Sequence, residues 1–285
     1  MSKVAVVTDS TANIPNELSQ GYPITFVPLQ VIWGEQTYRD GVDIEAGEFY
    51  TRLKTTKVMP TTSQPSPAAF QQIYEKLLEE GYDILSVHIS SKLSGTFDSA
   101  TQARANFPGA RIELVDSNTI SLAMGFPIMA ALHAAEQGAS LEECRALVER
   151  GCQNTGLLFA VNTLEFLRRG GRIGGAAAFL GTALNLKPLL EVRGGRIEAV
   201  ERVRTMSKAI DRLLDLFEER IGNRAPLHIG CVHAQAEAEA CLLLDRVIQR
   251  FGSDRVSESM LAPVSPVIGT HTGPGCIGLA FLAGM

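Results

Sequence analysis

The stretch DILSVHISSKLSGTFDSA, residues 83–100, decides the fold because it joins an apolar run to a hydroxyl-rich loop and then to a helix. Residues 83–89 are typical of a buried strand, and a helix is expected from about residue 97 to residue 107. No His, Asp or Glu lies within residues 90–96 to activate a serine. The stretch predicts a strand–loop–helix unit, and it leaves open whether Ser94 reacts with a substrate or holds a ligand.

The same alternation continues through the first half of the chain. Further apolar runs typical of strands occupy residues 4–7, 23–33 and 110–115. A helical spacing of apolar residues follows residue 67, and Ser140 with Glu143 forms a capping box that opens another helix. Strands that alternate with helices favour a mostly parallel sheet flanked by helices. We therefore expect an α/β fold.

The second half reads differently. Residues 188–203 predict a hairpin that turns at Gly194 and Gly195, and two helices with two or three further strands follow it. This order suits a smaller α/β domain with a mixed sheet and two layers. We expect one domain over residues 1–154 and a second over residues 155–285.

Composition excludes several classes of protein. The net charge of −5 is spread along the chain, so no basic stripe predicts nucleic-acid binding. Only four consecutive apolar residues precede Asp9, which argues against a secretory signal, and the uncharged stretch 117–135 suits a buried helix better than a membrane span. The five cysteines show no CxxC spacing and are expected to be reduced thiols in a cytoplasmic protein. No metal site is expected.

Hydroxyl-rich segments collect where predicted strands end or helices begin. They are residues 8–11, 61–66, 90–96 and 116–119. Loops at the carboxyl ends of parallel strands meet at one edge of the sheet, where ligands bind. Hydroxyls and free N–H groups at a helix start favour an anion such as phosphate or carboxylate, and Gly95 would let the backbone approach it. Helix capping is the alternative for each segment.

Two readings compete for the remaining polar residues. Ser94 lacks the nucleophile-elbow pattern, but His271, in a Thr/Gly/Pro-rich loop, is the best candidate for a base or for a ligand donor. In RRGGR (168–172), Arg172 precedes the charge-free stretch 176–186. A cation beside an apolar run suits an amphiphile with an acid group and a hydrocarbon tail, whereas a solvated helix end is the simpler alternative.

Six ordered motifs carry a resemblance to a known family. They are TDSTANIP (8–15), TTSQPS (61–66), SSKLSGTFDSA (90–100), VDSNTISLAMG (115–125), FLRRGGRIG (166–174) and THTGPG (270–275). From near residue 3 to its end, the chain resembles the DegV family of bacterial fatty-acid-binding proteins. The resemblance implies two α/β domains with a ligand slot between them.

The resemblance also implies a function. Family members carry one long-chain fatty acid, such as palmitate, without a cofactor and without catalysing a reaction. They present its carboxylate to a separate fatty acid kinase, which forms an acyl-phosphate for phospholipid synthesis. Transient contact with a membrane during lipid exchange is compatible with this role.

Matching positions imply which residues bind the ligand. The carboxylate is expected on Thr62, Ser94 and His271. Tail-lining positions do not transfer from the family, and it is their lack of charge that suggests the stretches 120–135 and 176–186 as the lining of the tail. Arg172 and Arg204 are expected to serve the head group or the kinase. Further residues assigned to the site are Ser63, Gly95 and Thr96. The alternatives are an esterase or acyltransferase that uses Ser94 and His271, and a phosphate- or nucleotide-binding regulator.

Overall fold

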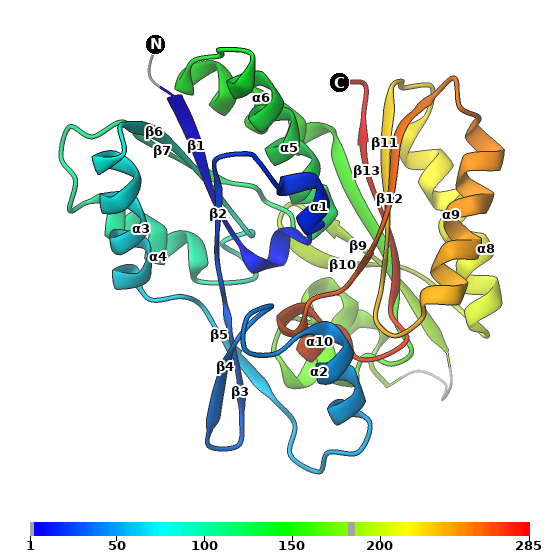
Figure 1. The fold of residues 1–285 in the computed structure, drawn as a ribbon. Coiled ribbons are helices and arrows are strands. Elements are labelled where there is room, and N and C mark those ends of the chain that lie inside the picture. Colours follow the sequence, from blue (N-terminus) through cyan, green and yellow to red (C-terminus); the bar gives the residue numbers. More distant parts are fainter. Residues whose placement is uncertain (1–2, 182–185) are drawn as a thin grey trace.

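The computed structural model describes residues 3–181 and 186–285, whose strands form three sheets. Figure 1 shows two large α/β units side by side, with the smallest sheet and its helices below the space between them. The predicted α/β class is confirmed, with a mostly parallel first sheet and a separate mixed sheet.

The first sheet has four parallel strands in the order β2-β1-β6-β7. Residues of β1 alternate between its faces: Val4 and Val6 pack on one side, Ala5 and Val7 on the other. Both faces are therefore covered by helices, as a parallel sheet requires. The strands are β1 (Lys3–Asp9), β2 (Ile24–Val27), β6 (Tyr82–His88) and β7 (Ile112–Asp116); the covering helices are α3 (Pro67–Glu79) and α4 (Thr96–Arg104) on one face, α5 (Leu122–Glu136) and α6 (Leu141–Asn154) on the other.

The second sheet has six strands among the described residues, in the order β10-β9-β8-β13-β11-β12. Only β11 and β12 pair in parallel, so the sheet is mixed as predicted. One face packs on α8 (Met206–Ile221) and α9 (Glu237–Phe251), and the other contacts α5. The strands are β8 (Thr155–Ala160), β9 (Lys187–Arg193), β10 (Arg196–Val203), β11 (Leu227–His233), β12 (Val256–Pro263) and β13 (Ile277–Ala283).

A third sheet, β4-β3-β5, was not predicted as a separate unit. Two of its strands, QTYR and TTS, are short and polar, so they carry no apolar run that would mark them in the sequence. The helix near the carboxyl end of the chain, α10, returns to contact this sheet. The unit comprises β3 (Gln30–Trp33), β4 (Gln36–Arg39), β5 (Thr61–Ser63), α2 (Ala46–Leu53), α10 (Pro266–Thr272) and, packed on α10, α7 (Glu165–Arg169); the remaining elements of the chain are η1 (Ser10–Ala12), α1 (Asn16–Ser19) and η2 (Gly174–Phe179).

The first sheet uses residues before 155, and the six-stranded sheet uses residues from 155 onward. We propose to keep the division at 154/155 on this ground. The second unit is shorter in residues, but its sheet has two more strands than the first sheet.

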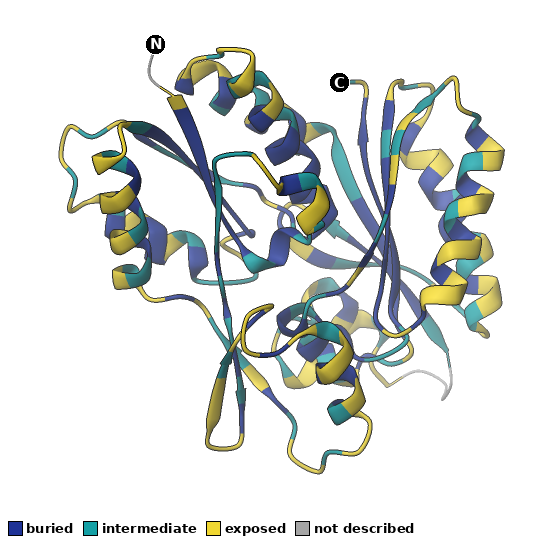
Figure 2. Ribbon diagram, in the orientation of Figure 1, coloured by how far each residue is buried: buried dark blue, intermediate teal, exposed yellow. Residues whose placement is uncertain are grey.

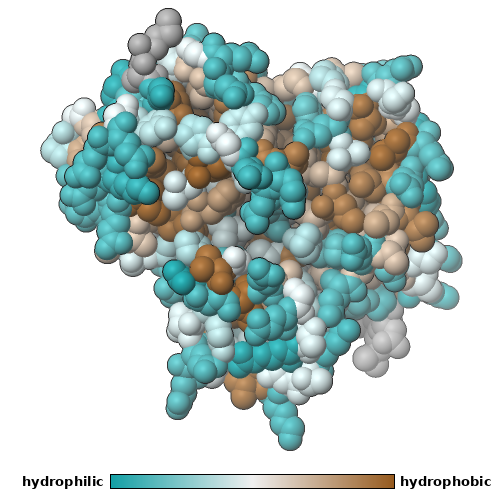
Figure 3. Space-filling view, in the orientation of Figure 1, coloured by the Kyte–Doolittle hydropathy of each residue, from teal (hydrophilic) through white to brown (hydrophobic). Residues whose placement is uncertain are grey.

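The surface is mostly hydrophilic. Figure 2 shows buried strands beneath helices whose outer faces are exposed, and Figure 3 shows apolar residues only in patches on this side of the molecule. No helix within residues 3–181 and 186–285 is long and apolar enough to cross a membrane. All five cysteines are free thiols.

The loop after β6 joins the two large units. Ser90 Oγ donates to the carbonyl of Gly195 at 2.9 Å, and Lys92 Nζ donates to the carbonyl of Gly194 at 2.6 Å. Both acceptors belong to the turn between β9 and β10, where the sequence predicted a hairpin. Gly195 has φ +79, and a Cβ there would lie 2.4 Å from Ser90 Oγ.

We expect Gly195→Ala to lower the free energy of unfolding by about 2–4 kcal/mol, since it adds a clash with buried Ser90 to an unfavourable backbone conformation. Gly194→Ala is the matched control: its φ is +57, nothing lies within 4 Å of its Cβ, and it should cost only about 1 kcal/mol. Urea denaturation measures both. Equal losses would mean that the contact with Ser90 is unimportant.

Candidate functional site

A largely apolar cavity lies between the two large units and the third sheet. Its empty volume is about 810 Å³ including the open space at its mouth. Its walls come from both halves of the chain, and they carry few polar groups. The lining residues are Leu29, Thr62, Ser63, Gln64, Ile89, Leu93, Ser94, Ile120, Ser121, Leu157, Phe159, Leu167, Arg172, Val192, Ile197, Val232, Val264, Val267, Ile268, His271, Thr272 and Cys276.

Thr62 and His271 meet at this cavity although 209 positions separate them in sequence. Thr62 Oγ1 and His271 Nε2 share a hydrogen bond of 2.8 Å. Thr62 is held by β5, which pairs it with Val31 of β3, and His271 lies in the last turn of α10. The third sheet thus brings together two residues that the sequence could only place in separate loops.

The helix that carries His271 is anchored by a buried carboxylate. Asp40 accepts hydrogen bonds from Ser10 Oγ at 2.7 Å and from the backbone N–H of Val267 at 3.3 Å. Burial raises the pKa of Asp40 to about 6, and its hydrogen bonds oppose that rise. Asp40 therefore ties the loop after β1 to the first turn of α10.

The environment of His271 favours its neutral form. Burial, with a smaller contribution from the positive charge of Arg172, lowers the pKa of His271 to about 4. A Cβ on Gly170 would lie 2.0 Å from His271 Nδ1, so glycine is required for the ring to fit. Nδ1 has no hydrogen-bond partner among the described residues. Near pH 7 the site thus offers a neutral imidazole.

Ser94 lines the cavity from the loop before α4. Its hydroxyl shares a hydrogen bond of 2.9 Å with Thr96 Oγ1, and Thr96 is buried behind it. Gly95 faces Gln64: a Cβ there would lie 2.9 Å from Gln64 Nε2. Ser63 also lines the cavity, whereas Gly95 and Thr96 stand behind its wall. Gly95 thus leaves room for Gln64 of the motif TTSQPS, whereas the sequence suggested that it lets the backbone approach an anion.

Arg172 is held at the edge of the cavity by two backbone carbonyls. Its Nε donates to the carbonyl of Leu93 at 3.1 Å and its Nη1 to that of Gly170 at 2.7 Å. A second opening shares Thr62, Arg172 and His271 with the cavity and is lined by Arg169 as well. These three shared residues therefore border both the cavity and a basic opening.

Composition suggested that the charge-free stretch 176–186 lines the tail, and the structure describes only part of it. None of its described residues lines the cavity, and Ala177, Ala178 and Leu180 are exposed. Residues 182–185 lie outside the described part of the chain. Helix α5 contributes mainly to the packed core between the sheets, so of 120–135 only Ile120 and Ser121 reach the cavity. Arg204 is exposed and does not line it.

The cavity walls also include residues that the sequence did not single out. Leu29, Ile89, Phe159, Val192 and Ile197 come from several separate elements. Each belongs to an ordinary apolar strand pattern, so no local signal distinguishes a residue that faces a cavity from one that faces a packed core.

Comparison with known proteins identifies the family. A family model described as "Uncharacterised protein, DegV family" matches residues 3–284. The chain belongs to the DegV family. A DegV domain-containing protein of Streptomyces coelicolor is 41% identical over 277 residues, which cover 97% of each chain.

Solved DegV structures share the fold over the whole chain. A DegV family protein from Thermus thermophilus, described by its fatty acid binding, is 39% identical with a TM-score of 0.93 and covers 99% of both chains. DegV of Bacillus subtilis, described as a fatty acid binding protein, is 34% identical with a TM-score of 0.88, over 99% of this chain and all of its own. A stearic acid-binding protein from Eubacterium ventriosum is 26% identical with a TM-score of 0.90, covering 99% of this chain and 98% of its own.

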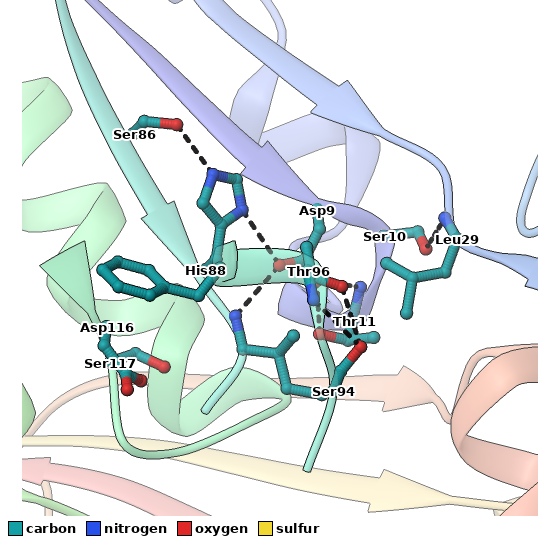
Figure 4. A network of polar contacts seen from close by, with 12 residues as sticks. Asp9, Ser10, Thr11, Leu29, Ser86, His88, Ser94, Thr96, Asp116 and Ser117 are labelled. Atoms are coloured by element: carbon teal, nitrogen blue, oxygen red, sulfur yellow. Dashed lines mark hydrogen bonds and ion pairs between the residues drawn. The ribbon is translucent and has the colours of Figure 1, made fainter. Parts of the chain in front are cut away.

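A Ser–His–Asp arrangement does occur in this DegV chain, but it is sealed in the first sheet. Ser86 Oγ lies 2.7 Å from His88 Nε2, and His88 Nδ1 lies 3.1 Å from Asp9 Oδ2 (Figure 4). Ser86, His88 and Asp9 are each fully buried, and Ser86 also bonds to Tyr74. A buried serine with two partners cannot meet a substrate, so the network supports the fold.

The geometry also disfavours a Ser94–His271 nucleophile. His271 Nε2 bonds to Thr62, Ser94 bonds to Thr96, and a lowered pKa makes His271 a poor base near pH 7. Among the described residues no group of three or more His, Cys, Asp or Glu is placed to hold a metal ion. This DegV cavity offers hydroxyl and neutral imidazole hydrogen-bonding groups, with Arg172 beside them, on a largely apolar wall.

We expect the stability of this DegV protein to depend on pH through His271. The unfolded chain binds a proton below its ordinary pKa of 6.5, whereas the folded chain does so only near 4. His271 should therefore lower the free energy of unfolding as pH drops from 6.5 to 4, by up to about 3 kcal/mol, whereas Asp40, whose pKa is raised to about 6, should act in the opposite direction below pH 6. Urea denaturation across this range should show the free energy of unfolding of His271→Gln gaining on that of wild type as pH drops, with the exposed His133→Gln as the control variant. Identical slopes for His271→Gln and wild type would contradict the assignment.

Proposed function

We propose that this protein binds one long-chain fatty acid, with its tail in the apolar cavity and its carboxylate on Thr62, Ser94 and His271. The observation that carries the proposal is the meeting of Thr62 and His271, whose Oγ1 and Nε2 lie 2.8 Å apart, on the wall of a largely apolar cavity. The fatty-acid binding described for the relatives from Thermus thermophilus and Bacillus subtilis supports it.

The energetics suit such a ligand. Burying about fourteen methylenes favours binding by roughly 11 kcal/mol at ~0.8 kcal/mol each, before the loss of translational and conformational freedom. A carboxylate removed from water must find hydrogen-bond donors or its burial is costly. The hydroxyls of Thr62 and Ser94 can rotate to donate, and the imidazole of His271 can donate from one nitrogen. Ser63 lies beside them, and Gly95 and Thr96 support the Ser94 loop from behind.

We further propose that the protein is a carrier which presents the carboxylate to a separate fatty acid kinase for conversion to an acyl-phosphate that feeds phospholipid synthesis. Thr62, His271 and Arg172 belong to both the cavity and the second opening, and on this proposal that opening is the outlet through which the carboxylate is reached. Arg169 and Arg172 make that outlet basic, which suits the negative charge of a phosphoryl group. On this proposal the protein works in the cytoplasm without a cofactor and contacts membranes only during lipid exchange.

The alternative, an esterase or acyltransferase, would use Ser94 or Thr62 with His271. Thr62 has the better geometry, since it bonds to His271 directly. A fluorophosphonate probe separates the two functions: the carrier should remain unlabelled at Ser94 and Thr62, and labelling of either would favour the enzyme.

The direct test of the carrier is extraction. Protein purified from bacterial cells should release a long-chain fatty acid on denaturation, identified by mass spectrometry. A lipid-free extract together with no binding of added palmitate would end the proposal.

Ser94→Ala should weaken palmitate binding by about 1–3 kcal/mol, because it removes a donor from a buried carboxylate. Isothermal titration with delipidated protein measures the change. Ser91→Ala, an exposed serine in the same loop, is the matched control and should bind as wild type does. If Ser94→Ala lowers the melting temperature but leaves palmitate affinity intact, the hydroxyl is structural.

Arg172→Ala should impair phosphorylation by the kinase more than it impairs lipid retention, because Arg172 borders the outlet and the tail provides most of the binding. Acyl-phosphate formation and bound lipid are measured on the same loaded samples. Arg168→Ala, an exposed arginine of α7 outside the opening, is the control. Equal losses of both quantities for Arg172→Ala would show that it serves the lipid instead.

A further inference from the structure

One hydroxyl at the cavity differs from all the others. Five residues that line the cavity carry hydroxyl groups, and four of those groups are hydrogen-bonded: Thr62 to His271, Ser63 to the carbonyl of Gln64, Ser94 to Thr96, and Thr272 to the carbonyl of Ile268. The fifth is Ser121, which is 2% exposed. Its Oγ has no hydrogen-bond partner among the described residues.

The position of Ser121 in the fold does not explain its side chain. Ser121 is the N-cap residue of α5, where a serine normally accepts a hydrogen bond from the helix, but here its side chain makes no such bond. Backbone hydrogen bonds alone hold the start of α5: the N–H of Ser121 donates to the carbonyl of Thr11 at 2.9 Å, and the carbonyl of Ser121 accepts from the N–H groups of Met124 and Gly125. The hydroxyl is therefore free for another partner.

The backbone conformation of Ser121 is one that would favour glycine, so the presence of a serine there needs an explanation. Its φ of 62 and ψ of −153 fall in a region that glycine occupies easily and other residues rarely do. A glycine would relieve this strain and keep every backbone hydrogen bond. The strained backbone and the unpaired, buried hydroxyl each lower the stability of the fold. A serine that does both points to a role in ligand binding.

Ser121 lies on the wall of the cavity and away from the second opening. Thr62, Arg172 and His271 line both, whereas Ser121, like Ser94, lines only the cavity. Its neighbours in the chain, Ile120 and Leu122, are apolar, and Leu122 packs against Gly230 of the second sheet. No hydrogen bond joins the Ser121 hydroxyl to a charged side chain among the described residues, so it is available to a neutral partner on the ligand.

We propose that Ser121 forms a second polar contact in the cavity, which recognises a hydroxyl or keto oxygen carried on the hydrocarbon chain of the ligand. The inference rests on the proposed fatty-acid binding and adds a substrate class to it. A hydroxyl group on the chain can both donate to and accept from Ser121 Oγ. An unsubstituted chain leaves this Oγ unpaired, so the cavity should favour an oxygenated chain whose substituent reaches it.

The test compares octadecanoic acid with its 3-, 10- and 12-hydroxy derivatives on delipidated full-length protein by isothermal titration. Wild type should bind at least one hydroxy acid as tightly as octadecanoic acid or more tightly. Ser121→Ala should lower the affinity for that hydroxy acid by about three- to tenfold and leave the affinity for octadecanoic acid unchanged. Ser117→Ala is the matched control: Ser117 is buried in the same loop, but its Oγ donates to the carbonyl of Thr119 at 3.2 Å and it does not line the cavity. For Ser117→Ala, the ratio of the affinity for the hydroxy acid to the affinity for octadecanoic acid should equal that of wild type.

Ser121→Gly provides a second variant in case the alanine variant folds poorly, since it removes the hydroxyl and relieves the backbone strain. Circular dichroism confirms folding of each variant. An equal loss of affinity for octadecanoic acid and for the hydroxy acids would assign Ser121 to the carboxylate or to the fold and overturn the inference. An unchanged affinity for every hydroxy acid would overturn it as well. Failure of wild type to bind octadecanoic acid or any of the hydroxy acids would instead refute the proposed function itself.

Discussion

A single buried carboxylate, that of Asp9, organises the edge of the first sheet on which the site is built. Its Oδ2 accepts from the backbone N–H of Ile89 at 2.9 Å and from His88 Nδ1 at 3.1 Å, and its Oδ1 accepts from the backbone N–H and the hydroxyl of Thr11. A carboxylate without solvent must have such partners, because an unpaired one would destabilise the fold. Figure 4 shows how these bonds join the chain after β1 to the chain after β6.

This edge of the first sheet positions several residues of the cavity wall. Ile89 lies on its wall, the loop after it delivers Ser94, and the carbonyl of Thr11 holds the N–H of Ser121. The same loop donates through Ser90 and Lys92 to the β9–β10 turn, so the edge also sets how the second unit packs. Polar bonds surround the cavity while its interior stays mostly apolar, an arrangement suited to a ligand with one acidic end.

The wall between the cavity and the basic opening has a distinct electrostatic character. His271 is kept neutral by burial and by Arg172, and both residues border the opening. On the proposed function, the neutral donors Thr62 and His271 would retain the carboxylate, and Arg169 and Arg172 would attract a negatively charged reactant. This division supports a carrier that leaves the chemistry to another protein.

Much of the fold was predictable from local pattern. The parallel first sheet follows from apolar runs such as 4–7 and 83–89 that alternate with helical spacing, and the β9–β10 hairpin follows from Gly194 and Gly195 between two strand-like runs. The third sheet was not predictable, because TTS and QTYR carry no apolar run. The described residues of the charge-free stretch 176–186 do not line the cavity, because composition reports the absence of charge and cannot say whether a segment faces a cavity or the solvent.

The sequence by itself determined the α/β class, the family and the hydroxyl-rich motifs that contain Thr62, Ser94 and His271, since these depend on neighbouring residues and on motif order. Only the tertiary structure decided that Thr62 meets His271 across 209 positions, that Gly95 faces Gln64, and that the hydroxyl of Ser121 is left unpaired beside the cavity. The physical reason is that hydrogen bonding and burial at a site depend on contacts between distant segments, which no local pattern specifies.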